Sequence, residues 1–362
     1  MAVEILRALA SLPIDRVAVA RWRGPLLPEL ADAASRSRLE PLRRLRVTLR
    51  RFRRTRRLAV VVEEWAARRV LRQERPDLVY LNTVKSASYV LPALRLGIRV
   101  VLHGHETGDL VSGTLDRYHL AALYSQVRLV ACSRAAAEDL RVVTGVKDVT
   151  VVPSAIDADR VRSMALAPLV SPAFQPDRST VVACGTANVG KGTDLWIDVA
   201  ARVHQALGDR CPRFVWIGAA GVNAYKASVR HLGLEGVVEL LPPASNPYPM
   251  MAAADVVTVP SRRESSSLVV LEAMALGIPV VAFDVGGIAD ELGEHGILVP
   301  SGDVDGMADA IVGLLDDEQA RRTLSNAASR RVDDNFGVGA FHRAVAGLVI
   351  EELGLDEVYP AW

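Results

Sequence analysis

Two glutamates eight positions apart flank the start of a predicted helix within residues 260–287. Glu264 lies in a serine-rich turn, and Glu272 lies on the apolar helix that follows. The apolar run before this stretch predicts a buried strand, residues 265–267 supply N-cap serines, and Gly277 closes the helix. Because the free amides of a helix N-terminus attract anions, the pattern predicts a site for a phosphate-bearing ligand.

Glu272 interrupts an otherwise apolar helix over residues 268–274. An unpaired carboxylate is costly to bury in such a helix, so we expect Glu272 to accept hydrogen bonds from a ribose diol. Glu264, before the helix, can reach hydroxyls on the other side of the phosphates. The alternative interpretation is a solvated glutamate on an amphipathic helix.

A second candidate group lies in a glycine-bearing loop. Gly185 ends a predicted strand, and Lys191 and Gly192 directly precede a helix that starts at Thr193. We expect Lys191 to face the ligand cleft. The alternative is an ordinary exposed lysine in a strand-to-helix loop.

A third group lies where another predicted strand ends, at His103, His105 and Glu106. Two histidines and a carboxylate are possible metal ligands, but a closed site needs more partners and none is spaced to help. Asn82 and Thr83 follow the preceding strand and are further candidates for a ligand site, although asparagine at a strand end is commonly a turn residue.

Short β-branched runs alternate with helical patterns along the chain, which predicts βαβ units and parallel sheets. The predicted strands are residues 16–20, 77–81, 98–103, 127–132 and 149–152, followed by TVVACG, RFVWIGA, GVVELL, DVVTVP, IPVVAF and GILVP. A looser segment separates the two series. We therefore expect two doubly wound domains, with ligands bound at the carboxyl ends of the strands in a cleft between the domains.

Composition narrows the class of protein. The chain has 43 Lys+Arg and 42 Asp+Glu residues, a formal charge of +1. This net charge argues against a protein whose overall surface binds a polyanion such as nucleic acid. Cys132, Cys184 and Cys211 have no metal-like spacing and are expected to be reduced thiols in the cytoplasm. Residues 1–16 do not show a basic region followed by an apolar core, and no apolar run is long enough to cross a bilayer, so we expect a soluble protein that is not secreted.

Residues 36–57 hold eleven arginines and one glutamate. Apolar residues recur among them at three- and four-residue spacing, namely Leu39, Leu42, Leu45, Leu49 and Phe52. The pattern predicts a cationic amphipathic helix on an anionic membrane surface that carries a lipid-linked acceptor. An arginine-rich solvated helix is the alternative.

At these motifs the chain resembles the retaining glycosyltransferases of family 4, in the group 1 superfamily with the GT-B architecture. The resemblance rests on the paired glutamates and on the stretches EAMALGIPVVAFDVGGIADEL, GILVPSGDVDGMADAI and GTANVGKGTDLWIDVAARV. It implies two Rossmann-like domains. The expected division is an N-terminal acceptor-side domain over 1–156, a linker over 157–178, a nucleotide-sugar-binding domain over 179–335, and a helix over 336–362 that crosses back to the first domain.

The resemblance also implies roles for individual residues. Lys191 matches the lysine that binds the donor's diphosphate and stabilises the leaving group, and His105, with His103 next, matches a histidine that hydrogen-bonds the donor sugar, with Glu106 orienting it. The implied catalytic residues are His105, Lys191 and Glu264. The implied donor-binding residues are Gly185, Thr186, Lys191, Gly218, Arg262, Ser266, Ser267, Leu268, Val269 and Glu272. The implied acceptor-side residues are Asn82, Thr83, His103 and Glu106.

The chain departs from the family's pattern at two places. Many members have an arginine where Thr186 stands, so we expect Arg262 or Arg263 to supply the second charge on the diphosphate. Members usually open with a hydrophobic strand and a glycine-rich loop, whereas this sequence opens on the helix that follows them. Either the first domain lacks its first strand or the true start lies upstream.

The function that the resemblance implies is transfer of a sugar from a nucleoside-diphosphate sugar to an acceptor hydroxyl with retention of configuration, the EC 2.4 class. The expected setting is glycolipid, polysaccharide or glycoconjugate biosynthesis. It implies no cofactor, no obligatory metal, a sugar or lipid-linked acceptor, and a cytoplasmic enzyme, peripheral on the inner face of the membrane. The alternatives are an inactive nucleotide-sugar-binding subunit and a GT-B nucleotide-sugar epimerase. The sequence does not predict an oligomeric state.

Overall fold

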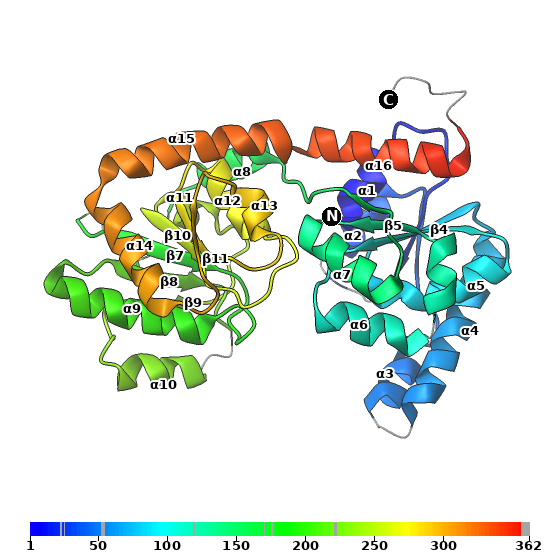
Figure 1. Ribbon diagram of the computed structural model, residues 1–362, viewed down its shortest axis with the longest axis horizontal. Helices are drawn as coiled ribbons and strands as arrows, with labels where there is room; N and C mark the ends of the chain where they lie inside the picture. The colour runs from blue at the N-terminus through cyan, green and yellow to red at the C-terminus, as the bar shows by residue number, and fades with distance from the viewer. Residues whose placement is uncertain are drawn as a thin grey trace. The chain divides into compact units, whose positions relative to one another are not determined.

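The structure is a computed structural model of the 362-residue chain (Figure 1). It describes residues 1–21, 24, 26–51, 55–118, 120–169, 171, 173–174, 177–220 and 223–355. The chain divides into two compact units. Unit 1 comprises Met1–Ser154 and the chain from Val338 onward, and unit 2 comprises Ala155–Gly337.

Unit 1 is built on parallel strands formed by the predicted apolar runs. Its main sheet has the order β3 (Leu78–Leu81), β4 (Arg99–Gly104), β5 (Arg128–Ala131) and β6 (Val149–Val151). A separate parallel pair is formed by β1 (Val17–Ala20) and β2 (Arg36–Leu39). Among the described residues no strand joins β1 to β3, so the strands of this unit lie in two sheets.

The helices of unit 1 surround these strands. They are α1 (Ala2–Ala8), α2 (Leu27–Ala33), α3 (Arg43–Arg51), α4 (Arg56–Glu74), α5 (Val90–Arg95), α6 (Asp109–Leu115), α7 (Arg134–Thr144) and α16 (Val338–Leu353). The last of these packs against α1, where His342 Nε2 lies 2.9 Å from a Glu4 carboxylate oxygen. No helix in the described ranges is both long enough and apolar enough to cross a membrane.

Unit 2 contains one parallel sheet of six strands. Its order is β12 (Ile297–Val299), β11 (Val280–Phe283), β10 (Val256–Val259), β7 (Thr180–Cys184), β8 (Arg213–Ile217) and β9 (Val238–Leu241). Its helices are α8 (Ala158–Ala165), α9 (Thr193–Leu207), α10 (Asn223–His231), α11 (Tyr248–Ala252), α12 (Leu268–Ala275), α13 (Ile288–Leu292), α14 (Val304–Asp316) and α15 (Glu318–Asn335).

Both faces of this six-stranded sheet are covered by helices. One core packs α9 and α14 against the sheet around Trp196, Phe214 and Trp216. The other packs α8, α12, α13 and α15 on the opposite face, as Figure 1 shows. This arrangement explains why the strand residues of β10 and β11 are buried throughout and read as continuous apolar runs. The doubly wound prediction for this unit is confirmed.

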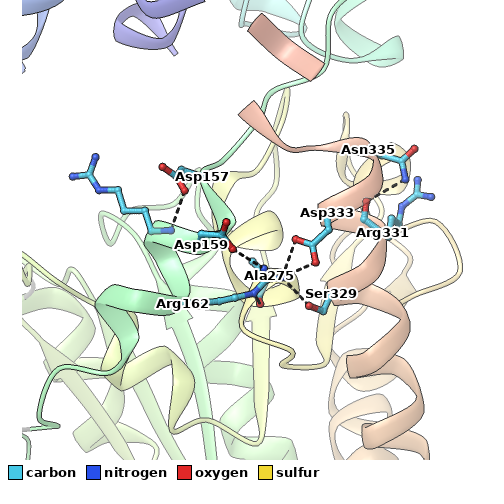
Figure 2. A network of polar contacts seen from close by, with 9 residues as sticks. Asp157, Asp159, Arg162, Ala275, Ser329, Arg331, Asp333 and Asn335 are labelled. Atoms are coloured by element: carbon cyan, nitrogen blue, oxygen red, sulfur yellow. Dashed lines mark hydrogen bonds and ion pairs between the residues drawn. The ribbon is translucent and has the colours of Figure 1, made fainter. Parts of the chain in front are cut away.

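The predicted linker over residues 157–178 is wrong in its first part, which forms helix α8 of unit 2. Asp157 caps this helix by accepting from the Arg160 amide at 2.9 Å. Arg162 then bonds both carboxylate oxygens of Asp333 on α15 at 2.9 Å and the Ala275 carbonyl of α12 at 3.0 Å (Figure 2). These contacts make the segment part of the packed unit, which the sequence pattern did not indicate.

The single cationic helix predicted over residues 36–57 is also wrong. Residues Arg36–Leu39 pair with β1 as strand β2, and Leu42 has a φ of +58°, a left-handed conformation that interrupts a helix. Helix α3 follows this residue, and a second helix, α4, begins at Arg56. Residues 52–54, which include the predicted apolar position Phe52, lie outside the described residues.

A buried carboxylate ties α3 to α4. Glu63 is 1% exposed, receives a hydrogen bond from Tyr118 Oη at 2.5 Å and pairs with Arg50 Nε at 2.7 Å. A buried carboxylate is costly unless it is paired and hydrogen-bonded, so the ion pair with Glu63 holds Arg50 of α3 against α4. Part of the arginine-rich segment is therefore structural.

Candidate active site

The lysine and the first glutamate singled out in the sequence meet in unit 2. Lys191 Nζ lies 2.5 Å from Glu264 Oε1, and Ser261 Oγ donates to the same oxygen at 2.9 Å. The Glu264 side chain is 9% exposed and that of Lys191 is 38% exposed. The pair therefore has one buried carboxylate and one ammonium group that a ligand can reach.

Glycine positions Glu264 through contact between two loops. Gly286, after β11, has a φ of +58°, and a Cβ built on it would lie 1.4 Å from the Glu264 carbonyl oxygen. The Gly287 amide donates to that carbonyl at 3.3 Å. Only a residue without a side chain allows the loops after β10 and β11 to approach so closely.

The loop that carries Lys191 is held by its own side chains. Asn188 Oδ1 accepts from the Lys191 amide at 3.0 Å, and Thr193 Oγ1 accepts from the Asn188 amide at 3.0 Å. Gly192 lies against Pro260, where an added Cβ would come within 1.8 Å of the carbonyl oxygen. Asn188 was not among the site residues predicted from the sequence, although asparagine in a loop with glycine is a common turn signal.

The other glycines predicted for the donor site also lie together. Gly185 and Gly218 follow β7 and β8, and a Cβ on Gly218 would be 2.4 Å from the Gly185 carbonyl oxygen. Thr186 continues the first of these loops, and its carbonyl oxygen accepts from Nδ2 of the Asn188 side chain at 2.9 Å. The two glycines thus allow the backbones of these loops to approach closely at this end of the sheet.

Arg262, predicted as a second cation for the diphosphate, is bound within the protein. Its two terminal nitrogens each lie 2.7 Å from a carboxylate oxygen of Asp194 on α9. The hydrogen bond from Arg262 holds the pKa of Asp194 below its ordinary value. The charge of Arg262 is therefore balanced by Asp194, a partner that sequence spacing did not indicate.

Glu272 lies on α12 and is hydrogen-bonded by a tyrosine. Tyr248 Oη, from α11, donates to Glu272 Oε1 at 3.0 Å. Burial raises the pKa of the Glu272 carboxyl to about 7, which this hydrogen bond partly offsets. Tyr248 was not among the site residues predicted from the sequence.

The start of α12 is contacted by an acidic side chain that the sequence analysis missed. Ser266 Oγ donates to Glu291 Oε1 at 2.5 Å, and the Ser267 amide donates to the two Glu291 oxygens at 2.8 and 3.1 Å. The next amides, of Leu268 and Val269, belong to the first turn and have no acceptor within the helix. These two amides fit the predicted anion-binding role.

The polar residues predicted in unit 1 also converge, at the carboxyl ends of β3 and β4. His105 Nε2 lies 2.7 Å from Asn82 Oδ1, and because an amide oxygen only accepts, Nε2 carries the hydrogen. The His103 and His105 rings lie with centroids 4.1 Å apart. Burial lowers the pKa of His105 to about 4, so the ring is neutral at neutral pH. Tyr80 Oη is 2.8 Å from His103 Nδ1.

Glu106 holds the backbone around this histidine pair. Its carboxylate accepts from Thr83 Oγ1, from the Val84 amide at 3.2 Å and from the His105 amide at 3.1 Å. Glu106, expected to orient the histidine, thus contacts the main chain, while Asn82 contacts the ring. Across the described residues, no cluster of three or more His, Cys, Asp or Glu side chains could hold a metal ion.

Two family models match this chain. The model described as Glycosyltransferase Family 4 matches residues 1–160, and the model described as Glycosyl transferases group 1 matches residues 178–317. The chain belongs to glycosyltransferase family 4, group 1. The recognition from the sequence is therefore confirmed.

Similarity to curated proteins is strong over part of the chain. A D-inositol 3-phosphate glycosyltransferase of Corynebacterium aurimucosum is 43% identical over 148 residues, which are 38% of this chain and 35% of that protein. An N-acetyl-alpha-D-glucosaminyl L-malate synthase of Bacillus anthracis is 36% identical over 110 residues, 30% of this chain and 29% of that protein. The matches thus span about a third of the length of these relatives.

Solved structures share the fold over nearly the whole chain. A glycosyltransferase from Rickettsia africae has a TM-score of 0.78 at 13% identity and covers 97% of this chain and 94% of its own. Anabaena HepE in complex with UDP-glucose has a TM-score of 0.75 at 21% identity and covers 96% of each chain. The fold of this family 4 protein is GT-B, as predicted.

Proposed function

We propose that this protein transfers a sugar from a nucleoside-diphosphate sugar to an acceptor hydroxyl, with retention of anomeric configuration. The observation that carries the proposal is the Lys191–Glu264 contact of 2.5 Å in the unit that also presents the free first-turn amides of α12. A cation and amides directed at one anion are what a departing diphosphate requires.

Each contact in unit 2 suits one part of such a donor. Lys191 and the Leu268 and Val269 amides bind the diphosphate, Glu272 binds the ribose diol, and Glu264 binds hydroxyls of the sugar. His105 hydrogen-bonds the transferred sugar as a neutral imidazole that accepts, since its one hydrogen, on Nε2, is directed at Asn82. We assign no obligatory metal and no cofactor to the reaction.

The names of the relatives support small polar acceptors. One relative is named for inositol phosphate and another for L-malate, both hydroxyl-bearing anions, and HepE was crystallised with UDP-glucose. We therefore place UDP-sugars first in a donor panel and hydroxylated anions first in an acceptor panel, within glycolipid or glycoconjugate synthesis in the cytoplasm.

Calorimetric titration with UDP-, GDP- and ADP-sugars tests the donor site directly. We expect one donor to bind selectively in the presence of EDTA, and both Lys191→Ala and Glu272→Ala to weaken it by about tenfold or more, ~1.4 kcal/mol. The surface variant Lys226→Ala is the matched control. A folded protein that binds no donor would contradict the proposal, and donor binding without transfer to any acceptor would favour the inactive subunit.

We also propose that unit 1 contacts an anionic membrane surface through α3 and α4. Leu58, Val61 and Trp65 are 56%, 62% and 51% exposed and recur at helical spacing on α4, and the Arg69 guanidinium lies 5.8 Å from the Trp65 ring centroid. Exposed apolar and aromatic residues next to arginines are typical of helices that lie in a lipid interface.

Co-sedimentation with liposomes tests this surface. We expect binding to phosphatidylglycerol vesicles but not to phosphatidylcholine vesicles, and a loss of about tenfold, ~1.4 kcal/mol, in Val61→Asp/Trp65→Ser. The double variant Val142→Asp/Leu166→Ser changes residues that are also exposed but lie elsewhere, and should bind like the wild type. Equal binding to both kinds of vesicle would overturn the proposal.

A further inference from the structure

Glu291 is a buried carboxyl group at the mouth of the anion site, and the proposed function assigns it no role. Glu291 is 3% exposed, and its carboxylate oxygens face Ser266 and Ser267, the two residues just before α12. A negative charge at this position would repel a diphosphate bound to the next two amides of the same helix. An anion can therefore bind next to Glu291 only if the negative charge of Glu291 is compensated or removed.

The charged groups around Glu291 do not neutralise it. Glu264 and Asp290 are the nearby acids, and both act to raise its pKa. Arg331 of α15 donates to the main-chain carbonyls of Glu291 and Asp290, each at 2.7 Å, so it bonds the backbone and not the carboxylate. Lys191 is held by Glu264.

We propose that Glu291 is a positioning residue that holds the first turn of α12 in its protonated form, so that binding of the donor's diphosphate takes up a proton. The proton comes from solvent and adds to a Glu291 carboxylate oxygen. The resulting O–H donates to Ser266 Oγ over the 2.5 Å contact, and the Ser267 amide continues to donate to the other oxygen.

This change turns the serine hydroxyl around. With Glu291 ionised, the Ser266 hydroxyl hydrogen is directed at the carboxylate. With Glu291 protonated, Ser266 Oγ accepts from Glu291 and its own hydrogen is released to donate to a phosphate oxygen. Protonation thus removes a repelling charge and adds one hydrogen-bond donor to the site.

The ordinary chemistry of a buried carboxyl supports the proposal. Burial is the largest cause that raises the pKa of Glu291, to about 8, and the hydrogen bonds from Ser266 and Ser267 act in the opposite direction. Because the protonated form binds the diphosphate better, affinity is retained below this pKa and lost as the pH rises above it.

The test measures the affinity for the nucleoside diphosphate of the donor identified above, between pH 6.5 and 9.5, in wild type and Glu291→Gln. We expect the wild-type Kd to rise about tenfold from pH 7 to pH 9, as linkage to one proton requires, beyond any change seen in the variant. Glutamine keeps the shape and carries no charge, so the Glu291→Gln protein should bind with a nearly constant Kd.

Calorimetry at pH 8.5 in two buffers of different ionisation enthalpy adds a readout that a merely structural role would not change. We expect net proton uptake on binding by wild type, less by Glu291→Gln, and wild-type uptake by the matched control Glu294→Gln, which removes an exposed carboxylate just after the same helix that does not act on the pKa of Glu291. Equal pH dependence and equal uptake in wild type and Glu291→Gln would overturn the inference alone.

The inference rests on the proposed function, and the two fail differently. Binding of no nucleoside diphosphate by folded protein at any pH would overturn the donor site and the inference together. Binding that depends on Lys191 but is unaffected by Glu291→Gln would leave the donor site standing and refute only the role of Glu291.

Discussion

Replacing Lys191 by methionine should lower kcat/KM for sugar transfer about 10²- to 10³-fold, with a smaller loss of donor affinity. The ammonium group lies 2.5 Å from Glu264, and the Lys191 side chain is 38% exposed to solvent. Its attraction for the diphosphate grows as the bond to the sugar breaks and negative charge develops, so the effect falls mainly on the transition state.

Initial rates at varied donor concentration measure this loss. Lys226→Met removes an exposed lysine of α10 in the same unit and should leave kcat/KM within about twofold, ~0.4 kcal/mol, of wild type. A Lys191→Met enzyme with unchanged kcat/KM would show that the lysine is an ordinary loop residue, the alternative interpretation of its sequence.

Replacing Gly286 by alanine should be the most destabilising single change near the site. The new Cβ would lie 1.4 Å from the Glu264 carbonyl oxygen, and the backbone φ of +58° adds strain. The two loops must separate, which displaces Glu264, and we expect a loss of about 3 kcal/mol or more of unfolding free energy together with loss of donor binding.

The variant Gly302→Ala is a control that separates the steric overlap of an added Cβ from the backbone strain of a positive φ. Gly302 has a φ of +82° but nothing within 4 Å of an added Cβ, so it should cost only about 1–2 kcal/mol. Urea unfolding, followed by the fluorescence of the buried Trp196 and Trp216 of unit 2, compares the two variants. Similar losses of unfolding free energy in Gly286→Ala and Gly302→Ala would show that the two loops can move apart without an energetic cost.

The sequence alone predicted the parallel strands and the main ligand-binding motifs. Each predicted strand appears within a residue or two, because runs such as DVVTVP and IPVVAF are buried on both faces and leave no periodicity for a helix. It likewise predicted that Lys191, Glu264 and Glu272 belong to one domain, since local turn and cap signals place Lys191 and Glu264 in loops that follow strands of the second series and Glu272 on the helix after Glu264.

What the sequence could not predict is which polar groups pair across long separations. The partners of Glu272, of Arg262 and of the Ser267 amide are Tyr248, Asp194 and Glu291, and no local pattern marks them. These pairings depend on the order of strands in the sheet and on how the loops after β10 and β11 approach one another.

The arginine-rich segment shows the same limit. Its three- and four-residue apolar spacing predicted one amphipathic helix, but pairing of Arg36–Leu39 with β1 makes the first part a strand. A few inter-strand hydrogen bonds outweigh a helix propensity that is worth only tenths of a kcal/mol per residue. The sequence by itself therefore determined the family, the strands and the motif residues. Only the tertiary structure decided which charges are compensated and which remain for a ligand, because those pairings require residues far apart in the chain to be packed together.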